Sequence, residues 1–215
     1  MGLHLGLVAI KGTVAELRDA VTTVWPHYET VQSASDFADE EALQDWASRH
    51  QKFVSVNDWS PSNRGQNVVV FYEDGKWAVV IDPSYVIAGD DAGLRRLSEI
   101  CGRTLAFVVE TAGGCAFFSC FENGRLQRKI EGVDRAVTLT GNSLPEEEGV
   151  DISGYYLDET EALATAFGLT GVACAPLVQT AIAVAFVDQT NFDLREKDTP
   201  PLAAKVATKP WWKFW

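Results

Sequence analysis

Residues that could carry chemistry are few, and they do not stand in the spacing of a known site. The chain has three histidines, which are His4, His27 and His50. None of them stands in H-x-x-x-H or H-E-x-x-H spacing, so the sequence predicts no zinc site. We expect each of the three to be a surface or packing histidine.

Cys115 has the most suggestive setting for catalysis, because it directly follows Gly113-Gly114. Backbone amides at two glycines could form an oxyanion hole beside a cysteine nucleophile. Such a site would need a histidine brought near by folding, which the sequence leaves open. The other interpretation, which we favour, is a glycine-rich connection followed by a buried cysteine without a catalytic role.

The glycines do not form a loop that could bind phosphate. Gly75-Lys76 is followed by Trp77 and lacks the pattern of a Walker loop. No G-x-G-x-x-G or G-x-S-x-G occurs anywhere in the chain. The sequence therefore predicts no bound cofactor and assigns no catalytic residue.

Acidic residues gather in three short clusters, at Asp36 to Glu41, at Asp90-Asp91 and at Glu146 to Glu148. Paired carboxylates can bind a divalent cation or act as acid and base. The first two clusters lie at expected helix starts, where the helix dipole favours negative charge. The third lies in an expected polar loop and should be solvated. We therefore predict no metal site at any of them.

The last residues carry an unusual pattern of three tryptophans and a phenylalanine within five positions. They are Trp211, Trp212, Phe214 and Trp215. Leaving them in water would be costly, since a large aromatic side chain buries about 150–250 Å² in a core. The tail could fold back on its own domain, dock on a second copy or a partner, or attach at a membrane surface. We favour the first, rank the membrane last, and take the four residues as the candidate partner-binding site.

Strands and helices alternate in the first part of the chain. Leu3 to Lys11 is an apolar run typical of a strand, and Thr13 with Glu16 forms a capping-box pattern that begins a helix. Later in the chain, Asp158 with Glu161 has the same spacing and predicts a short helix. Further expected elements are strands at 28–32, 105–110 and 181–187 and helices at 39–50 and 94–101.

Two β-hairpins are the most regular prediction, over residues 66–82 and 115–130. They should turn at Asp74-Gly75 and Asn123-Gly124, the dipeptides favoured in two-residue turns. Their similar letters leave an internal duplication open. We predict an α+β fold with a mostly antiparallel or mixed sheet and helices packed on it. It would form one domain over residues 1–198, or two packed halves at about 1–60 and 66–198, followed by a Pro/Trp-rich tail at 199–215.

The charge balance restricts the partners. The 215 residues include 18 Lys plus Arg and 30 Asp plus Glu, which gives a net charge of −12. Such a surface repels phosphate backbones, so we expect no nucleic-acid binding. It would suit a basic protein partner, although acidity that merely keeps the protein soluble is the commoner interpretation. A homo-oligomer formed through the tail is the other partner that the sequence allows.

The expected location is the cytoplasm. The first residues do not have the pattern of a signal peptide, and no apolar run reaches the ~18 residues of a membrane span. No C-x-x-C pair occurs, so the cysteines should be free thiols in a reducing compartment. They are Cys101, Cys115, Cys120 and Cys174.

The middle of the chain resembles small uncharacterised bacterial proteins of the immunity-protein type, which neutralise a toxin made by kin or neighbouring cells. The likeness covers residues 66–168 and lies in the order of an Asp-Gly hairpin, a tryptophan, Asp82-Pro83, a helix, the hairpin at Phe121 to Gly124 and a late short helix. It implies a non-catalytic protein with an acidic partner-binding surface, and it transfers no functional residue. We predict a non-catalytic protein-binding module, immunity-like or regulatory. The alternative is a small-molecule enzyme whose site is assembled from dispersed residues.

Overall fold

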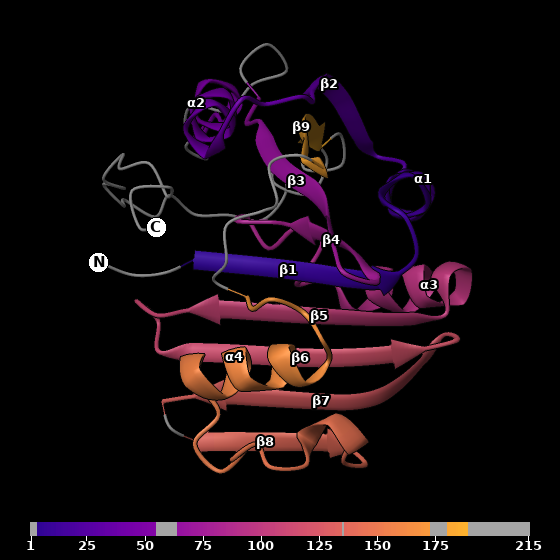
Figure 1. Cartoon of the computed structure of the whole chain (residues 1–215), viewed down its shortest axis with the longest axis vertical. Helices are drawn as coiled ribbons and strands as arrows, with labels where there is room; N and C mark the ends of the chain where they lie inside the picture. Colours follow the sequence, from indigo (N-terminus) through magenta and orange to yellow (C-terminus); the bar gives the residue numbers. More distant parts are fainter. Residues whose placement is uncertain (1–3, 55–63, 135, 173–179, 189–215) are drawn as a thin grey trace, which may run out of the picture.

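A nine-stranded antiparallel sheet organises the molecule (Figure 1). The structure, a computed structural model, describes residues 4–54, 64–134, 136–172 and 180–188. The strands are β1 (His4–Lys11), β2 (Tyr28–Ala34), β3 (Asn67–Asp74), β4 (Trp77–Ile81), β5 (Arg103–Glu110), β6 (Cys115–Glu122), β7 (Arg125–Val133), β8 (Ala136–Gly141) and β9 (Ile182–Asp188). The helices are α1 (Val14–Val24), α2 (Glu40–His50), α3 (Asp91–Cys101), the short 3₁₀ helix η1 (Pro145–Glu147) and α4 (Leu157–Ala166). The predicted α+β class is confirmed.

The first strand lies at the centre of the sheet because its sequence is apolar on both faces. Leu5, Leu7 and Ala9 point to one face and Val8 and Ile10 to the other, and all five are buried. β1 pairs with β4 on one side and with β5 on the other. The strands therefore follow the order β2-β9-β3-β4-β1-β5-β6-β7-β8, so segments from both ends of the chain share one sheet.

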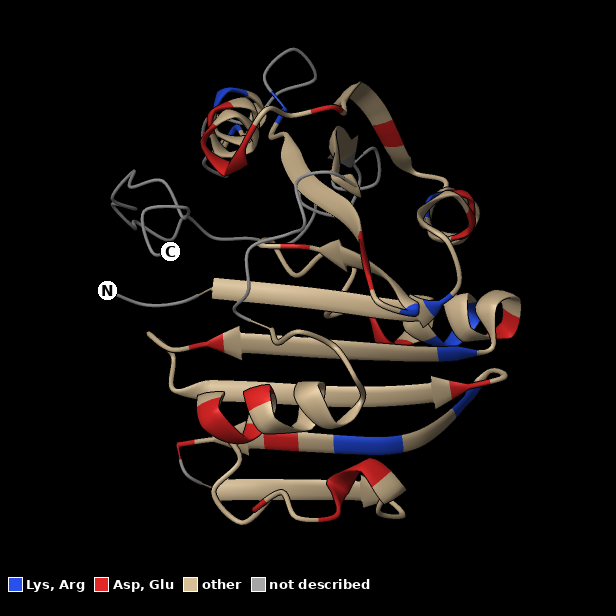
Figure 2. Cartoon of the chain, viewed as in Figure 1, with Lys and Arg blue, Asp and Glu red and all other residues tan. Residues whose placement is uncertain are grey.

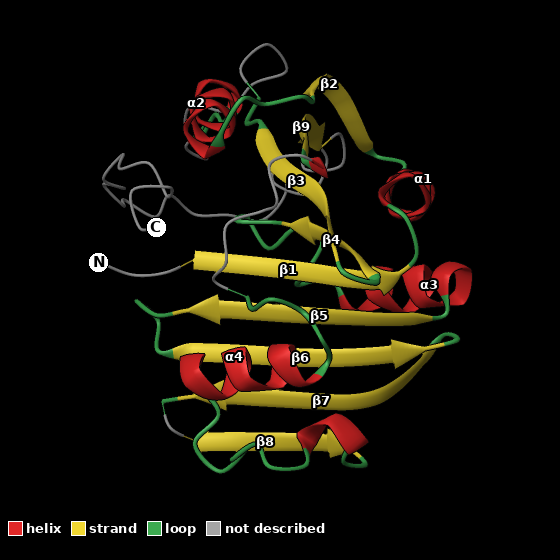
Figure 3. Ribbon diagram, in the orientation of Figure 1, coloured by secondary structure: helices red, strands yellow, loops and turns green. Residues whose placement is uncertain are grey.

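Two helices pack on each face of the sheet (Figure 3). α1 and α3 cover one face, where they contact each other. On the opposite face, Leu163 of α4 packs in a cluster with Tyr72, and Trp46 of α2 packs in a cluster with Val70. Since Val70 and Tyr72 are two residues apart on β3, they point to the same face. α2 and α4 therefore lie on the same side of the sheet.

The starts of the first and last helices show how capping decides element boundaries. The backbone amide of Thr13 donates to Glu16 Oε2 at 2.7 Å and the amide of Glu16 donates to Thr13 Oγ1 at 3.3 Å, as the capping-box pattern predicts. The predicted start of α4 at Asp158 is wrong. The amide of Tyr156 donates to Glu159 Oε2 at 3.0 Å, which starts the helix two residues earlier. Glu161 instead accepts from the amide of Val172 at 2.9 Å.

Both predicted hairpins are present. In the second, β6 and β7 turn at Asn123-Gly124, where both residues have positive φ (49° and 78°), as a type I′ turn requires. The first hairpin, formed by β3 and β4, has its turn one residue later than predicted. Asp74 pairs with Trp77, so Gly75-Lys76 forms the turn, with the glycine at φ 62° in the first central position, where a type II′ turn places it.

β8 is a strand that is not among the elements expected from the sequence. It follows β7 after a two-residue turn that begins at Asp134 (φ 50°), and the pairing runs from Val133–Ala136 to Arg128–Gly141. Only Val137 along the strand is half-buried, and its other residues are exposed. The run Val137-Thr138-Leu139-Thr140 does alternate apolar and polar residues, but four residues is the shortest run that indicates a strand, so the signal is weak.

Candidate functional site

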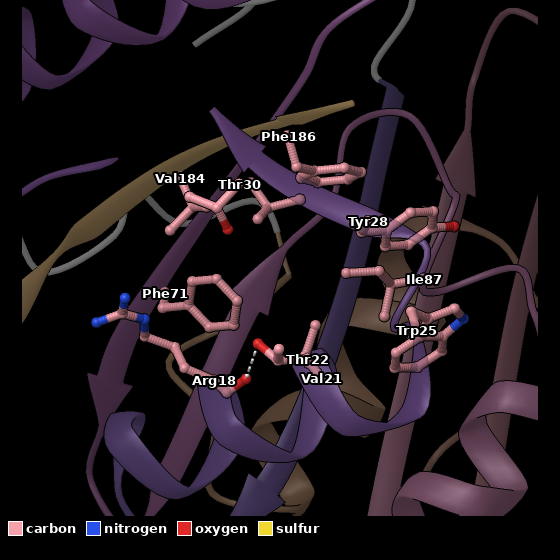
Figure 4. Close-up of a pocket in the computed structure, with 11 residues that line it drawn as sticks. Arg18, Val21, Thr22, Trp25, Tyr28, Thr30, Phe71, Ile87, Val184 and Phe186 are labelled. Carbon is pink, nitrogen blue, oxygen red and sulfur yellow. Dashed lines mark hydrogen bonds between the residues drawn. The ribbon is translucent and has the colours of Figure 1, made fainter. Parts of the chain in front are cut away.

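A small pocket lies between α1 and the strands β2, β3 and β9 (Figure 4). Its volume is about 50 Å³. That is enough for a few water molecules or one small apolar group, and far less than the roughly 300–1,000 Å³ typical of small-molecule sites. The lining residues are Arg18, Val21, Thr22, Trp25, Tyr28, Thr30, Val69, Phe71, Ile87, Val184 and Phe186.

The polar atoms of the two largest polar-tipped rings in the pocket wall, Trp25 and Tyr28, bond to groups outside the pocket. Trp25 Nε1 donates to Asp90 Oδ2 at 2.8 Å, and the Tyr28 hydroxyl donates to the carbonyl of Val86 at 3.1 Å, so both rings present their apolar parts to the pocket. Figure 4 shows the guanidinium of Arg18 at the end opposite Trp25. Arg18 is half-buried and makes no ion pair with any residue that the structure describes. Apart from the Arg18 guanidinium and the hydroxyls of Thr22 and Thr30, the wall is apolar, and no carboxylate, histidine or cysteine is among the described residues that line it.

A buried carboxylate shapes the neighbouring loop between β4 and α3. Asp82 is fully buried, and its Oδ2 accepts from the amides of Ile87 at 2.7 Å and Ala88 at 3.0 Å. Burial raises the pKa of the Asp82 carboxyl, and the hydrogen bonds from backbone amides oppose this rise. These bonds hold the loop against the sheet and place Ile87 in the pocket wall. Asp82 is thus a positioning residue for this loop.

Folding brings Cys115 beside a carboxylate and a histidine, which the sequence left open. Glu110 stands opposite His4 on β1 and opposite Cys115 on β6, so the three side chains share one face of the sheet. His4 Nδ1 lies in direct contact with Glu110 Oε2. Tyr85 stacks on the His4 ring at 6.3 Å between centroids. The order across the strands is histidine, glutamate, cysteine.

This order does not activate the thiol. Burial first, and then the negative charges of Glu110 and Asp134, raise the pKa of Cys115. A cysteine nucleophile must be a thiolate, which a raised pKa disfavours. The amide of Gly113, a candidate oxyanion donor, already donates to Glu110 Oε1 at 3.2 Å. The geometry therefore agrees with a cysteine that has no catalytic role.

The other two histidines pack against aromatic rings. His50 stacks on Trp46 at 4.1 Å, with Nδ1 2.7 Å from the Trp46 carbonyl and Nε2 2.9 Å from Gln32 Oε1. His27 meets the ring of Tyr28 edge-on at 4.3 Å. The contact of His50 with Gln32 joins α2 to β2, whereas His27 contacts its own neighbour in the chain just before β2. Both are packing or surface histidines, as expected.

The first two acidic clusters lie at helix starts, as predicted. The side chains of Asp39 and Asp90 cap α2 and α3, accepting from the amides of Ala42 at 2.8 Å and Gly93 at 3.0 Å. Asp91 is the first residue of α3 and pairs with Lys129 of β7.

The third cluster corrects the expectation of a solvated loop. The 3₁₀ turn at Pro145 directs two carboxylates back to the sheet, where Glu146 pairs with Arg103 and Glu147 pairs with Arg128, each at 2.8 Å. Glu147 and Arg128 are 8% and 4% exposed. Only Glu148 of this cluster is exposed.

Carboxylates lie on α2, on α4 and on the segment after β8, among other places in the molecule (Figure 2). We use the name acidic face for the carboxylates on and beside these elements that form no ion pair with a described residue. They are Asp36, Asp39, Glu40, Glu41, Asp45, Glu148, Asp151, Asp158 and Glu159. From Ala136 to Val172 the chain contains seven acidic residues and no lysine, arginine or histidine. Arg103, Arg128 and Lys129 on the strands are paired with carboxylates, whereas Arg125 of β7 and Lys11 of β1 form no ion pair with a described residue.

The tail residues Trp211, Trp212, Phe214 and Trp215 lie outside the described residues, as does Cys174. Cys101, Cys115 and Cys120 are free thiols. Within the described ranges, no group of three or more His, Cys, Asp or Glu side chains could hold a metal ion. The helices of these ranges are too short or too polar to cross a membrane.

Comparisons of the chain with protein-family models, with curated proteins and with solved structures found no match.

Proposed function

We propose that this protein is a non-catalytic binding protein that receives a basic protein partner on its acidic face. The run of acids on α2, on α4 and on the segment after β8 carries this proposal. These acids form no ion pair with a described residue, whereas Arg103, Arg128 and Lys129 on the strands pair with carboxylates. Arg49 of α2 and Arg125 of β7 are the basic residues of these elements that have no such pair among the described residues. A face lined by one sign of charge attracts an oppositely charged partner and speeds its association.

A non-catalytic role also agrees with the small size of the pocket beside α1. The pocket beside α1 is small and apolar, and its one charged lining residue is Arg18. An enzyme assembled from dispersed residues, the alternative function, would need a nucleophile or an acid–base pair in a cavity that holds its substrate. The Cys115 thiol lies against Glu110, and its pKa is raised where a nucleophile needs it lowered.

An immunity-like role fits the proposal in its chemistry. A protein that inhibits a basic toxin or enzyme needs an acidic surface broad enough to cover a positively charged one. The acidic face spans two helices and the segment between β8 and α4. A regulatory protein with a basic target would use the surface in the same way.

The test is affinity capture from the native host followed by titration of the captured protein at several salt concentrations. The binding variant carries Glu41→Gln, Asp45→Asn and Asp158→Asn on the acidic face. The matched control carries Asp19→Asn, Glu99→Gln and Glu122→Gln, which change the net charge equally on other elements. We expect a basic partner whose affinity falls with salt and falls further in the binding variant than in the control. An acidic partner whose affinity is insensitive to salt would overturn the proposal.

A further inference from the structure

β8 is an edge strand open to solvent. It pairs only with β7, and its sequence Ala-Val-Thr-Leu-Thr-Gly contains no charge and no proline. Leu139 is 51% exposed. Proteins normally protect such an edge with charges, proline or a bulge, because it is a ready template for another strand. The opposite edge, β2, has this protection, since its register shifts between Thr30 and Gln32.

The turn before β8 fixes which backbone groups face outward. Val133 and Ala136 close a two-residue hairpin, so they exchange hydrogen bonds across the turn. Residues of an antiparallel strand alternate in direction, so Val137 and Leu139 aim their N–H and C=O groups away from β7. No described residue donates to or accepts from these groups. An incoming strand would find two donors and two acceptors at the spacing of a β-ladder.

The charge around this edge selects the kind of strand that can approach it. The turn before β8 contains one acid, exposed Asp134, and one basic residue in sequence, Arg135, so it adds no net charge. The chain after β8 carries exposed Glu148 and Asp151 and has no basic residue from Ala136 to Val172, which leaves the surroundings of the strand acidic. Figure 2 shows β8 as an uncharged strand beside the acidic segment that follows it. A second copy of this chain would bring two such acidic segments together, whereas a basic strand would be attracted to one.

We propose that β8 takes up an extended, basic segment of the partner protein as a tenth strand of the sheet. This rests on the proposed function and names the place and form of the contact. Main-chain hydrogen bonds from Val137 and Leu139 would give affinity, an apolar residue opposite Leu139 would cover its side chain, and flanking lysines or arginines would meet the acids.

The probe is a labelled heptapeptide of alternating lysine and valine. Its matched controls are the same peptide with alternate amides N-methylated, which keeps the charge but blocks strand pairing, and the peptide with glutamate for lysine. We expect the unmodified peptide to bind at least about tenfold more tightly than either control, since two or more hydrogen bonds are lost on methylation. The amides of Val137 and Leu139 should gain protection from hydrogen exchange when it binds.

Two variants at one position test the strand itself. Leu139→Pro removes an outward N–H, which an edge strand tolerates, and Leu139→Ala keeps it. We expect the proline variant to lose peptide binding and the alanine variant to retain most of it, with both melting near the wild-type temperature. Equal binding of the N-methylated peptide would overturn the β8 site while leaving the acidic face in place. Equal binding of the glutamate peptide would overturn the basic partner as well. Protection of Val137 and Leu139 that rises with protein concentration alone would assign β8 to a second copy and overturn this inference.

Discussion

Replacing Glu147 with glutamine should destabilise the protein strongly, although the residue was expected to be solvated. Its Oε2 pairs with Arg128 at 2.8 Å, and its Oε1 accepts from the amide of Leu144 at 2.8 Å. Glutamine keeps the length of the side chain and an acceptor for Leu144. The substitution therefore removes mainly the counterion of a buried guanidinium.

The magnitude follows from the burial of the two charges. The side chains of Arg128 and Glu147 are 5% and 6% exposed, so Arg128 would stay buried with only the carbonyl of Gly141 as a strong partner. Removing one member of a buried ion pair costs about 3–5 kcal/mol. For a protein of this size that corresponds to a fall of about 6–20 °C in melting temperature.

The neighbouring residue supplies a matched control. Glu146→Gln breaks the pair with Arg103, whose two side chains are 20% and 23% exposed, and it should cost about 1 kcal/mol. Urea unfolding of the wild type and both variants, followed by circular dichroism, compares the free energies of unfolding. Equal losses in the two variants would refute the idea that burial of the Arg128–Glu147 pair anchors the segment after β8.

Three further predictions concern the interior and the tail. Burial raises the pKa of Asp82 above its ordinary value of 3.8, so its contribution to stability is fully present at low pH and is lost as pH rises through the folded-state pKa. The free energy of unfolding of Asp82→Asn should therefore rise relative to that of the wild type between pH 4 and pH 8. A difference that stays constant with pH would contradict this. Gly132→Ala places a methyl group 2.0 Å from the carbonyl oxygen of Tyr155 and should cost about 3 kcal/mol in urea unfolding, whereas Gly154→Ala, with open space around it, should be neutral. Deleting residues 209–215 should lower the melting temperature or dissociate an oligomer, and no change in either would show that the tail is not structural.

Features that depend on a few neighbouring residues were predictable from sequence. The Thr13–Glu16 capping box and the Asn123-Gly124 turn are specified within four residues, because capping and turn geometry are local. The predicted cap at Asp158 was wrong because Tyr156 and Glu159 offer the same spacing two residues earlier. Local patterns identify such an element well but can misplace its boundary.

Contacts between distant strands were not predictable in the same way. The line of His4, Glu110 and Cys115 depends on the registers of two strand pairs, and the ion pair of Arg128 with Glu147 depends on how the chain after β8 turns back. One signal was available, since Asp82 directly follows the five apolar residues of β4 and an acid there is placed to be buried.

The net charge gains a functional meaning only through the fold. A charge of −12 by itself indicates solubility. The fold pairs Arg103, Arg128 and Lys129 with carboxylates, and it places acids that have no ion pair to a described residue on α2, on α4 and on the segment after β8. That segment borders the one edge of the sheet that lacks a bulge or a charge. An exposed neutral edge can pair with any strand, including that of another copy of the chain. Acids beside the edge would repel another acidic copy and attract a basic partner, so they would make the pairing selective.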